Sequence, residues 1–145
     1  MNTPSSETPR YTTAPSADDI AALAERALEG IPARLRRHIS NLAIAVEEEA
    51  DEATLAEMGL ESPWDLSGLY HGTPLGARSV SDPVRTPDMI LLYRMPILLE
   101  WIEEGEDLFR LVRNVLIHEI GHHFGLSDAD IEALEAEGDT EGEEA

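Results

Sequence analysis

The stretch HEIGHHFGLSD, residues 118–128, decides most of what this sequence predicts. Its two histidines His118 and His122 stand four positions apart, and Glu119 directly follows the first. Residues four apart lie on the same face of an α-helix, one turn above the other. The spacing therefore predicts a helix that presents both imidazoles to one metal ion, and zinc is the ion that this motif is typical of.

Gly125 and Asp128 extend the pattern to H-E-x-x-H-x-x-G-x-x-D. Glycine tolerates the left-handed backbone conformation that ends a helix and turns the chain, so the helix is expected to end there and the chain to return Asp128 as a third ligand. Three protein ligands leave the fourth position of a tetrahedral zinc open, as in catalytic sites. Glu119 is offset by one residue from His118. It is expected to flank the ion and act as general base, taking a proton from the attacking water and later giving it to the leaving amine.

Composition describes an acidic chain of 145 residues, with 30 acidic residues against 10 basic ones and a net charge of −20. Such a charge repels nucleic acid and anionic lipid, so neither is expected as a partner. The chain has no cysteine, which excludes disulfides and thiolate zinc sites and leaves histidine and carboxylate as ligands.

Signals for export or membrane insertion are not found in the sequence. The N-terminal residues MNTPSSETPRYTTAPS lack the basic start and the apolar stretch of a signal peptide. No apolar run approaches the roughly 18 residues that span a bilayer. A cytoplasmic protein without membrane contact is therefore expected.

One domain is expected over residues 17–137. Residues 1–16, rich in Pro, Ser and Thr, predict a disordered tail, and residues 138–145 predict an acidic tail. Apolar periodicity and capping residues predict helices at 17–29, 33–37, 51–58, 96–104, 106–123 and 130–137, and strands at 42–46, 69–73 and 89–93. Met89–Tyr93 is expected to be buried, and Pro74 indicates that the strand at 69–73 ends there or lies at a sheet edge. Trp64 and Trp101 are expected to pack in the core.

Together these segments resemble the short bacterial zincin-like metallopeptidases. The resemblance covers roughly residues 17–135 and is carried by a helix ending in Gly-Ile-Pro, by the segments NLAIAVE, GLYHGTPL and PDMILLYR, and by HEIGHHFGLSD. It implies an α+β fold of the minimal zincin-like type, a small mixed β-sheet packed on a long active-site helix carrying HExxH. It also implies one zinc ion, with His118, His122 and Asp128 as ligands and Glu119 as the catalytic residue.

Other third ligands stay open. Related zincin classes place a histidine at the position of Asp128, or take a glutamate from a later helix, for which Glu141, Glu143 and Glu144 are candidates at a marginal distance. All four methionines precede the motif, so the methionine-containing turn of one such class cannot follow it. His123 is rotated by about 100° from His122 on a helix and is expected to support the site rather than bind the ion.

The function that these patterns favour is hydrolysis of peptide bonds in a peptide or protein substrate. Zincins bind peptides against an edge strand, so Tyr70 and His71 in the predicted edge strand are candidates for the substrate cleft. An equally good interpretation makes them ordinary strand residues. The alternative function is a zinc-binding module with a structural or regulatory role and little or no activity, because the chain is short and has no evident second wall for a substrate.

Overall fold

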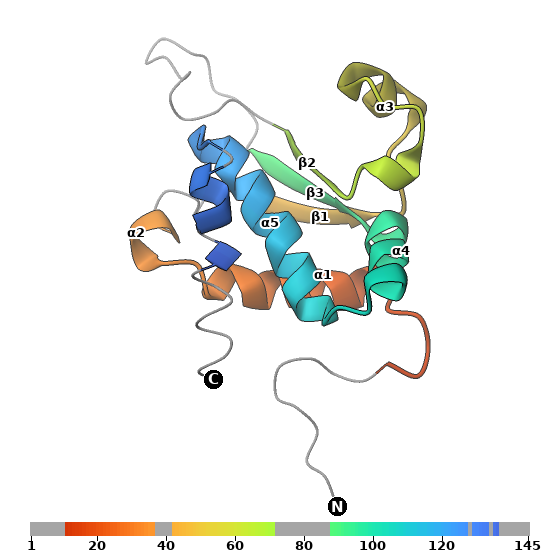
Figure 1. Ribbon diagram of the computed structural model, residues 1–145, viewed down its shortest axis with the longest axis horizontal. Helices are drawn as coiled ribbons and strands as arrows, with labels where there is room; N and C mark the ends of the chain where they lie inside the picture. Colours follow the sequence, from red (N-terminus) through yellow and green to blue (C-terminus); the bar gives the residue numbers. More distant parts are fainter. Residues whose placement is uncertain (1–10, 37–41, 72–87, 128, 134, 137–145) are drawn as a thin grey trace, which may run out of the picture.

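The computed structural model describes residues 11–36, 42–71, 88–127, 129–133 and 135–136. The elements are α1 (Ala17–Glu29), α2 (Ala33–Arg36), β1 (Ala43–Glu47), α3 (Glu52–Met58), the 3-10 turn η1 (Pro63–Asp65), β2 (Gly68–His71), β3 (Met89–Tyr93), α4 (Arg94–Glu104) and α5 (Leu108–Phe124) (Figure 1). Residues 129–133 and 135–136 are also helical. Predictions for residues 1–10, 72–87 and 137–145 fall outside the described residues. Among the described helices, none has the length and apolar character needed to cross a membrane.

Within the described part of the chain, the sheet is mixed and three-stranded, with the order β1-β3-β2. Strand β3 pairs parallel to β1 and antiparallel to β2, so the predicted buried strand is the central one and β2 is at an edge, as expected. Successive residues of a strand point to opposite faces of the sheet. Ile90 and Leu92 of β3 accordingly belong to one core cluster, while Tyr93 and the partly buried Leu91 belong to another.

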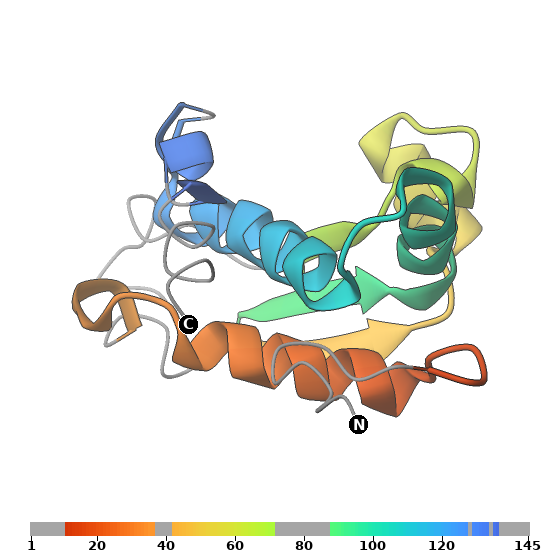
Figure 2. The same ribbon diagram turned by 60° about the horizontal axis from the view of Figure 1, so that its bottom comes forward.

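The larger cluster, called here the main core, lies between the sheet and two helices. Helices α1 and α5 run over the same face of the sheet, α1 against β1 and α5 against β2 and β3 (Figure 2). Where α1 and α5 meet, the Arg26 guanidinium lies 4.5 Å from the centre of the Phe109 ring. The long helix is apolar on several sides because it is central, and Leu108, Val112 and Leu116 are fully buried in it.

Helix α1 begins where the sequence predicts. Ser16 and Asp19 form a reciprocal capping box, in which the Ser16 hydroxyl accepts from the Asp19 N–H at 3.1 Å and the Asp19 carboxylate accepts from the Ser16 N–H at 2.8 Å. Two free N–H groups of the first turn are thereby satisfied, which stabilises this end of the helix.

The smaller cluster lies on the opposite face of the sheet and is built by Ala50, Leu55, Leu66 and Tyr93. It is covered by α3, which ends at Gly59 in the left-handed conformation, with φ 70°. The prediction for Trp64 is wrong: it sits on η1 at 45% exposure. Trp101 is partly buried against the main core, as expected, and its ring meets Tyr11 edge-on at a centroid distance of 6.1 Å.

Helices α4 and α5 each begin two residues away from the predicted position. Helix α4 begins at Arg94 rather than Pro96, because β3 runs directly into it and Tyr93 is its N-cap. Proline is tolerated in the first turn of a helix, where its missing N–H would have no partner within the helix. Helix α5 begins at Leu108, and the side chain of Asp107 caps it by accepting from the N–H of Arg110.

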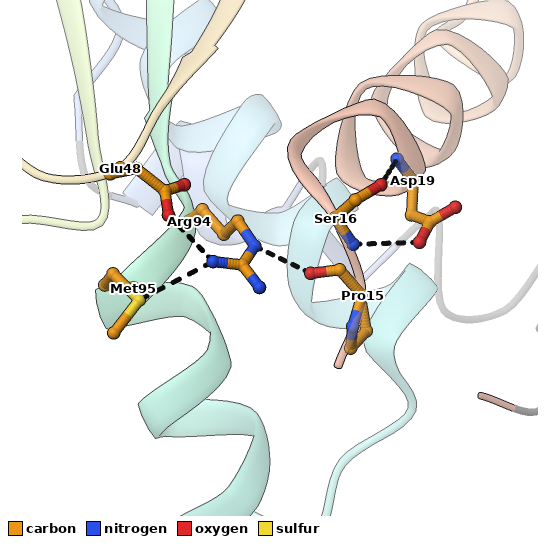
Figure 3. A network of polar contacts seen from close by, with 6 residues as sticks. All are labelled: Pro15, Ser16, Asp19, Glu48, Arg94 and Met95. Atoms are coloured by element: carbon orange, nitrogen blue, oxygen red, sulfur yellow. Dashed lines mark hydrogen bonds and ion pairs between the residues drawn. The ribbon is translucent and has the colours of Figure 1, made fainter. Parts of the chain in front are cut away.

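Arg94 connects three segments that are distant in sequence (Figure 3). Its Nε donates to the Pro15 carbonyl at 2.7 Å, and its Nη1 donates to Glu48 Oε1, just after β1, at 2.8 Å. Pro15 is fully buried, and Tyr11 packs against the main core. Residues 11–16, which the sequence assigns to a disordered tail, thus pack against the domain. The bonding partner of Arg94 could not be read from local sequence, because it lies 79 positions away.

Replacing Arg94 with Ala is expected to lower the free energy of unfolding by roughly 1–3 kcal/mol, because the Pro15 carbonyl then loses a charged donor in a partly buried setting. Urea denaturation measures the effect. The control is Glu48→Ala, which removes only an ion pair to a carboxylate that is 61% exposed and is expected to cost less than about 1 kcal/mol. Equal effects of the two substitutions would contradict a role for the bond to Pro15.

Candidate metal centre

The last turns of α5 bring together His118, Glu119 and His122. One ligand atom from each of the three side chains lies within 4.8 Å of the others, and the two imidazole centroids are 4.8 Å apart at an interplanar angle of 66°. Two nitrogens that share a tetrahedral zinc at about 2.0–2.1 Å lie roughly 3.3 Å apart. The chemistry of the donor set, two imidazoles and a carboxylate within 4.8 Å of one another, fits one zinc ion.

A glycine turn ends α5 directly after this group. Gly125 has φ 70°, the Leu126 N–H donates to the Gly121 carbonyl at 2.9 Å, and the Gly125 N–H donates to the His122 carbonyl at 3.1 Å. This pair of bonds is the Schellman motif, in which only the left-handed glycine lets the chain reverse at low cost. The turn that the sequence predicts at Gly125 is confirmed. Leu126 packs against the main core after it.

A further helix starts just beyond the turn. The Ser127 hydroxyl accepts from the Asp130 N–H at 3.2 Å, and the Ser127 carbonyl accepts from the Ile131 N–H at 3.0 Å. Asp128 itself lies outside the described residues, so its role as third ligand stays a prediction. The side chains of His123 and the glutamates of the C-terminal tail lie outside the described part as well.

Gly121 allows this further helix to pack on the last turns of α5, which carry the candidate metal ligands. A Cβ added at Gly121 would lie 2.4 Å from Cγ1 of Ile131, a side chain that is 2% exposed. Only a residue without a side chain permits so close an approach. The role of Gly121 was not predicted from the sequence, where an isolated glycine within a helical pattern is the signal that could have found it.

Glu119 is held more tightly than either histidine. It is 6% exposed, whereas His118 and His122 are exposed. Its carboxylate accepts a hydrogen bond from the backbone N–H of Tyr70, and its Oε1 lies 3.2 Å from Nδ1 of His122. Burial raises the pKa of Glu119 above that of an ordinary glutamate, although the charge of His118 and the bond from Tyr70 both act to lower it.

Gly68 lets the edge strand approach α5 at this point. Gly68 and Tyr70 pair with Leu92 and Ile90, whose side chains belong to the main core, so they share the face of the sheet that α5 covers. A Cβ at Gly68 would lie 2.8 Å from Cγ1 of Val115 and 3.3 Å from Cγ of Glu119. Sequence reasoning missed this role, because a glycine beside a strand gives no information on which helix lies opposite.

A double-mutant cycle between Gly68 and Val115 tests this contact. Gly68→Ala is expected to lower the free energy of unfolding by roughly 1–3 kcal/mol, because its methyl group overpacks the interface with Val115. Val115→Ala removes the atom that the methyl group meets. The double variant should therefore be more stable than the sum of the two single effects by at least about 0.5 kcal/mol. Additive effects in urea denaturation would show that β2 does not rest on Val115.

Tyr70 and His71 occupy different surroundings in β2. Tyr70 is partly buried and packs against the main core, while its backbone N–H donates a hydrogen bond to the Glu119 carboxylate. His71 is exposed at the end of the strand. Neither is among the residues that line the cavity described next. Contact of these two residues with a substrate stays a prediction.

An open cavity of about 400 Å³ adjoins the group formed by His118, Glu119 and His122. Its floor is one face of α5, at the spacing i, i+3, i+4, i+7 and i+8: Leu111, Asn114, Val115, His118 and Glu119. Its walls are residues 65–68, which run from the end of η1 to the start of β2, together with Glu100 of α4 and Glu106 of the connection between α4 and α5. A cavity of this size is in the range of small-ligand sites.

Glu100 in the cavity wall has a consequence for stability. Desolvation, followed by the charges of Glu106, Glu104 and Glu103, raises the pKa of Glu100 above its ordinary value of 4.5. A raised pKa in the folded state contributes stability at low pH that is lost as the pH rises through that pKa. Glu100→Gln is therefore expected to stabilise the protein at pH 7, and the gain should disappear below the ordinary pKa of 4.5. Thermal unfolding across this pH range, with Glu25→Gln on α1 as control, measures the difference; a gain independent of pH would contradict it.

Comparison with known proteins agrees with this geometry. A family model for zincin-like metallopeptidases matches residues 39–138, more than half of the chain. The match includes all three strands and α5 with its His-Glu-His group, but not α1. No curated protein gives a significant match. The small mixed sheet against a long helix confirms the predicted minimal zincin-like α+β fold. The chain belongs to the family of zincin-like metallopeptidases.

Proposed function

We propose that the chain is a zinc-dependent peptidase, in which His118, His122 and Asp128 hold the ion and Glu119 is the general base. The observation that carries this proposal is the arrangement on α5, where a buried carboxylate lies between two exposed imidazoles one turn apart. The cavity beside it is lined by His118 and Glu119, so a substrate held there would meet the general base. A purely structural zinc site has no need of such an opening.

In this proposal, bound zinc supplies Lewis acidity toward the scissile carbonyl and the attacking water. Glu119 accepts the proton of that water and passes it to the leaving amine. The Tyr70 N–H orients the carboxylate, since a carboxylate with one oxygen engaged loses rotational freedom. The peptide lies along the edge strand β2, with Tyr70 and His71 beside it, by main-chain pairing of the kind that edge strands offer.

The test begins with metal removal. The full chain is stripped with a chelator and titrated with zinc, while bound zinc and hydrolysis of a fluorescence-quenched peptide library are measured together. One zinc per chain is expected, with hydrolysis returning in proportion to zinc and reaching its maximum at one equivalent. The double variant His118→Ala/His122→Ala should bind no zinc at micromolar concentration and hydrolyse nothing.

The alternative, a zinc-binding module without peptidase activity, predicts a different result. Such a module would bind one zinc per chain and hydrolyse no peptide in the library. Its thermal stability would rise with zinc, because a ligand that binds only the folded state stabilises that state. A chain that binds no zinc at all would overturn both functions.

A further inference from the structure

We propose that the cavity beside His118 receives the side chain of a lysine or arginine next to the cleaved bond, so that the substrates are basic peptides. This proposal rests on the peptidase function above and concerns the specificity of the same site. Three features of the cavity support it: its position, the apolar strip along its floor and the carboxylates in its walls.

The cavity extends from the metal-binding group along α5. Leu111 at its far end precedes His118 by seven residues, which corresponds to about 10 Å along a helix axis. Leu111 and Val115 provide an apolar strip between these ends. A long unbranched side chain can lay its methylene groups on such a strip and extend a polar end beyond it.

Three carboxylates line this cavity: Asp65 of η1, Glu100 of α4 and Glu106 of the connection that follows α4. Because η1, α4 and the connection after α4 all contribute to one cavity, these three carboxylates differ from the acidic face of a single helix. Among the residues that the structure describes, no arginine or histidine forms an ion pair with any of the three.

The ionised form of Glu100 is disfavoured at this site. The pKa of Glu100 is raised by partial burial and by neighbouring glutamates, among which Glu106 acts most strongly. A cation between Glu100 and Glu106 would relieve that repulsion, whereas an acidic side chain would add to it. An ammonium or guanidinium group on a long apolar stem therefore matches both the floor and the walls of the cavity.

The cavity that these carboxylates line is also lined by His118 and Glu119, so the carboxylates lie beside the proposed general base. A peptide whose scissile bond lies at the general base has a flanking side chain within reach of the cavity. The charge of that side chain should then control kcat/KM, which reports differences in binding to the transition state.

The experiment uses zinc-loaded full chain and quenched peptides of the form Ala-Ala-Xaa-Ala-Leu-Ala, with Xaa as Lys, Arg, norleucine or Glu. We expect kcat/KM for Lys and Arg to exceed that for norleucine by roughly tenfold and that for Glu by roughly a hundredfold. In Glu100→Gln/Glu106→Gln, the preference for Lys over norleucine should fall below about threefold.

The matched control is Glu103→Gln/Glu104→Gln. This variant also removes two negative charges, from the last turn of α4, but neither Glu103 nor Glu104 lines the cavity. If both double variants reduce the preference equally, general charge attraction explains it and the proposed subsite is overturned. Repeating the measurement at low and high salt gives a second check, because long-range attraction is screened more strongly than a contact within the cavity.

A binding measurement separates this proposal from peptidase function. Fluorescein-labelled forms of the same peptides are titrated with the zinc-loaded Glu119→Gln variant, and anisotropy is recorded. Cleavage by the native protein without any preference for Lys or Arg would overturn the subsite and leave the peptidase. Selective binding of basic peptides without cleavage would overturn the peptidase and leave the subsite. Neither cleavage nor selective binding would overturn both.

Discussion

Replacement of Glu119 by Gln is expected to lower kcat for peptide hydrolysis by roughly 10²–10⁴-fold, the range that one general base contributes. Glutamine has nearly the same shape and can still accept the hydrogen bond from the Tyr70 N–H. It cannot accept a proton from the attacking water. The loss should therefore appear in kcat, with the fold and the metal content unchanged. Steady-state kinetics and zinc analysis on the same preparations measure both.

Metal content decides between two roles for Glu119. The ligand atoms of His118, Glu119 and His122 all lie within 4.8 Å of one another, so the carboxylate is near enough to bind the ion itself. If Glu119 is a base, Glu119→Gln keeps one zinc per chain, and Glu103→Gln, which removes an exposed charge from α4, leaves kcat unchanged. Loss of zinc from Glu119→Gln would assign the carboxylate to the metal, and a kcat within tenfold of the native value would contradict the proposed mechanism.

Asp128→Ala is expected to weaken zinc binding by more than a hundredfold. Removal of a residue that only orients a ligand typically costs about 10–100-fold in metal affinity, and removal of a ligand should cost more. The described residues on either side support this role. Gly125 turns the chain back at the metal-binding turn, and Ile131 packs on Gly121 between the two histidines. The segment that carries Asp128 is thereby attached at both ends to the last turns of α5.

Competition with a chromophoric zinc chelator measures the affinity. Asp130→Ala, which removes the same charge two positions on, is the matched control and should bind zinc as the native chain does. Asp128→His replaces one zinc ligand by another and should recover part of the affinity. Zinc binding by Asp128→Ala at native strength would exclude Asp128, and the same measurement on Glu141→Ala, Glu143→Ala and Glu144→Ala would then identify a glutamate from the tail.

Local patterns predicted the elements that depend on near neighbours in the sequence. The start of α1 at Ala17, the left-handed turn at Gly125 and the buried strand Met89–Tyr93 are all confirmed. Each depends on hydrogen bonds or side-chain periodicity within a few residues, which a local reading contains. The predictions for the start of α4 and for the burial of Trp64 were wrong. Helix α4 starts directly after β3, with Tyr93 as its N-cap, and Trp64 is not part of the smaller cluster that Ala50, Leu55, Leu66 and Tyr93 form.

The sequence by itself determined the chemistry of this protein: two imidazoles and a carboxylate on one helix face, followed by a glycine turn. That result follows from the 3.6-residue period of the helix and needs no distant contact. Only the tertiary structure decided what surrounds this group. Gly68 brings the edge strand against Val115 so that Tyr70 can hold Glu119, and α4 adds Glu100 to a cavity whose floor is α5. These contacts join residues that are tens of positions apart, and no periodicity in the sequence encodes which distant surfaces will meet.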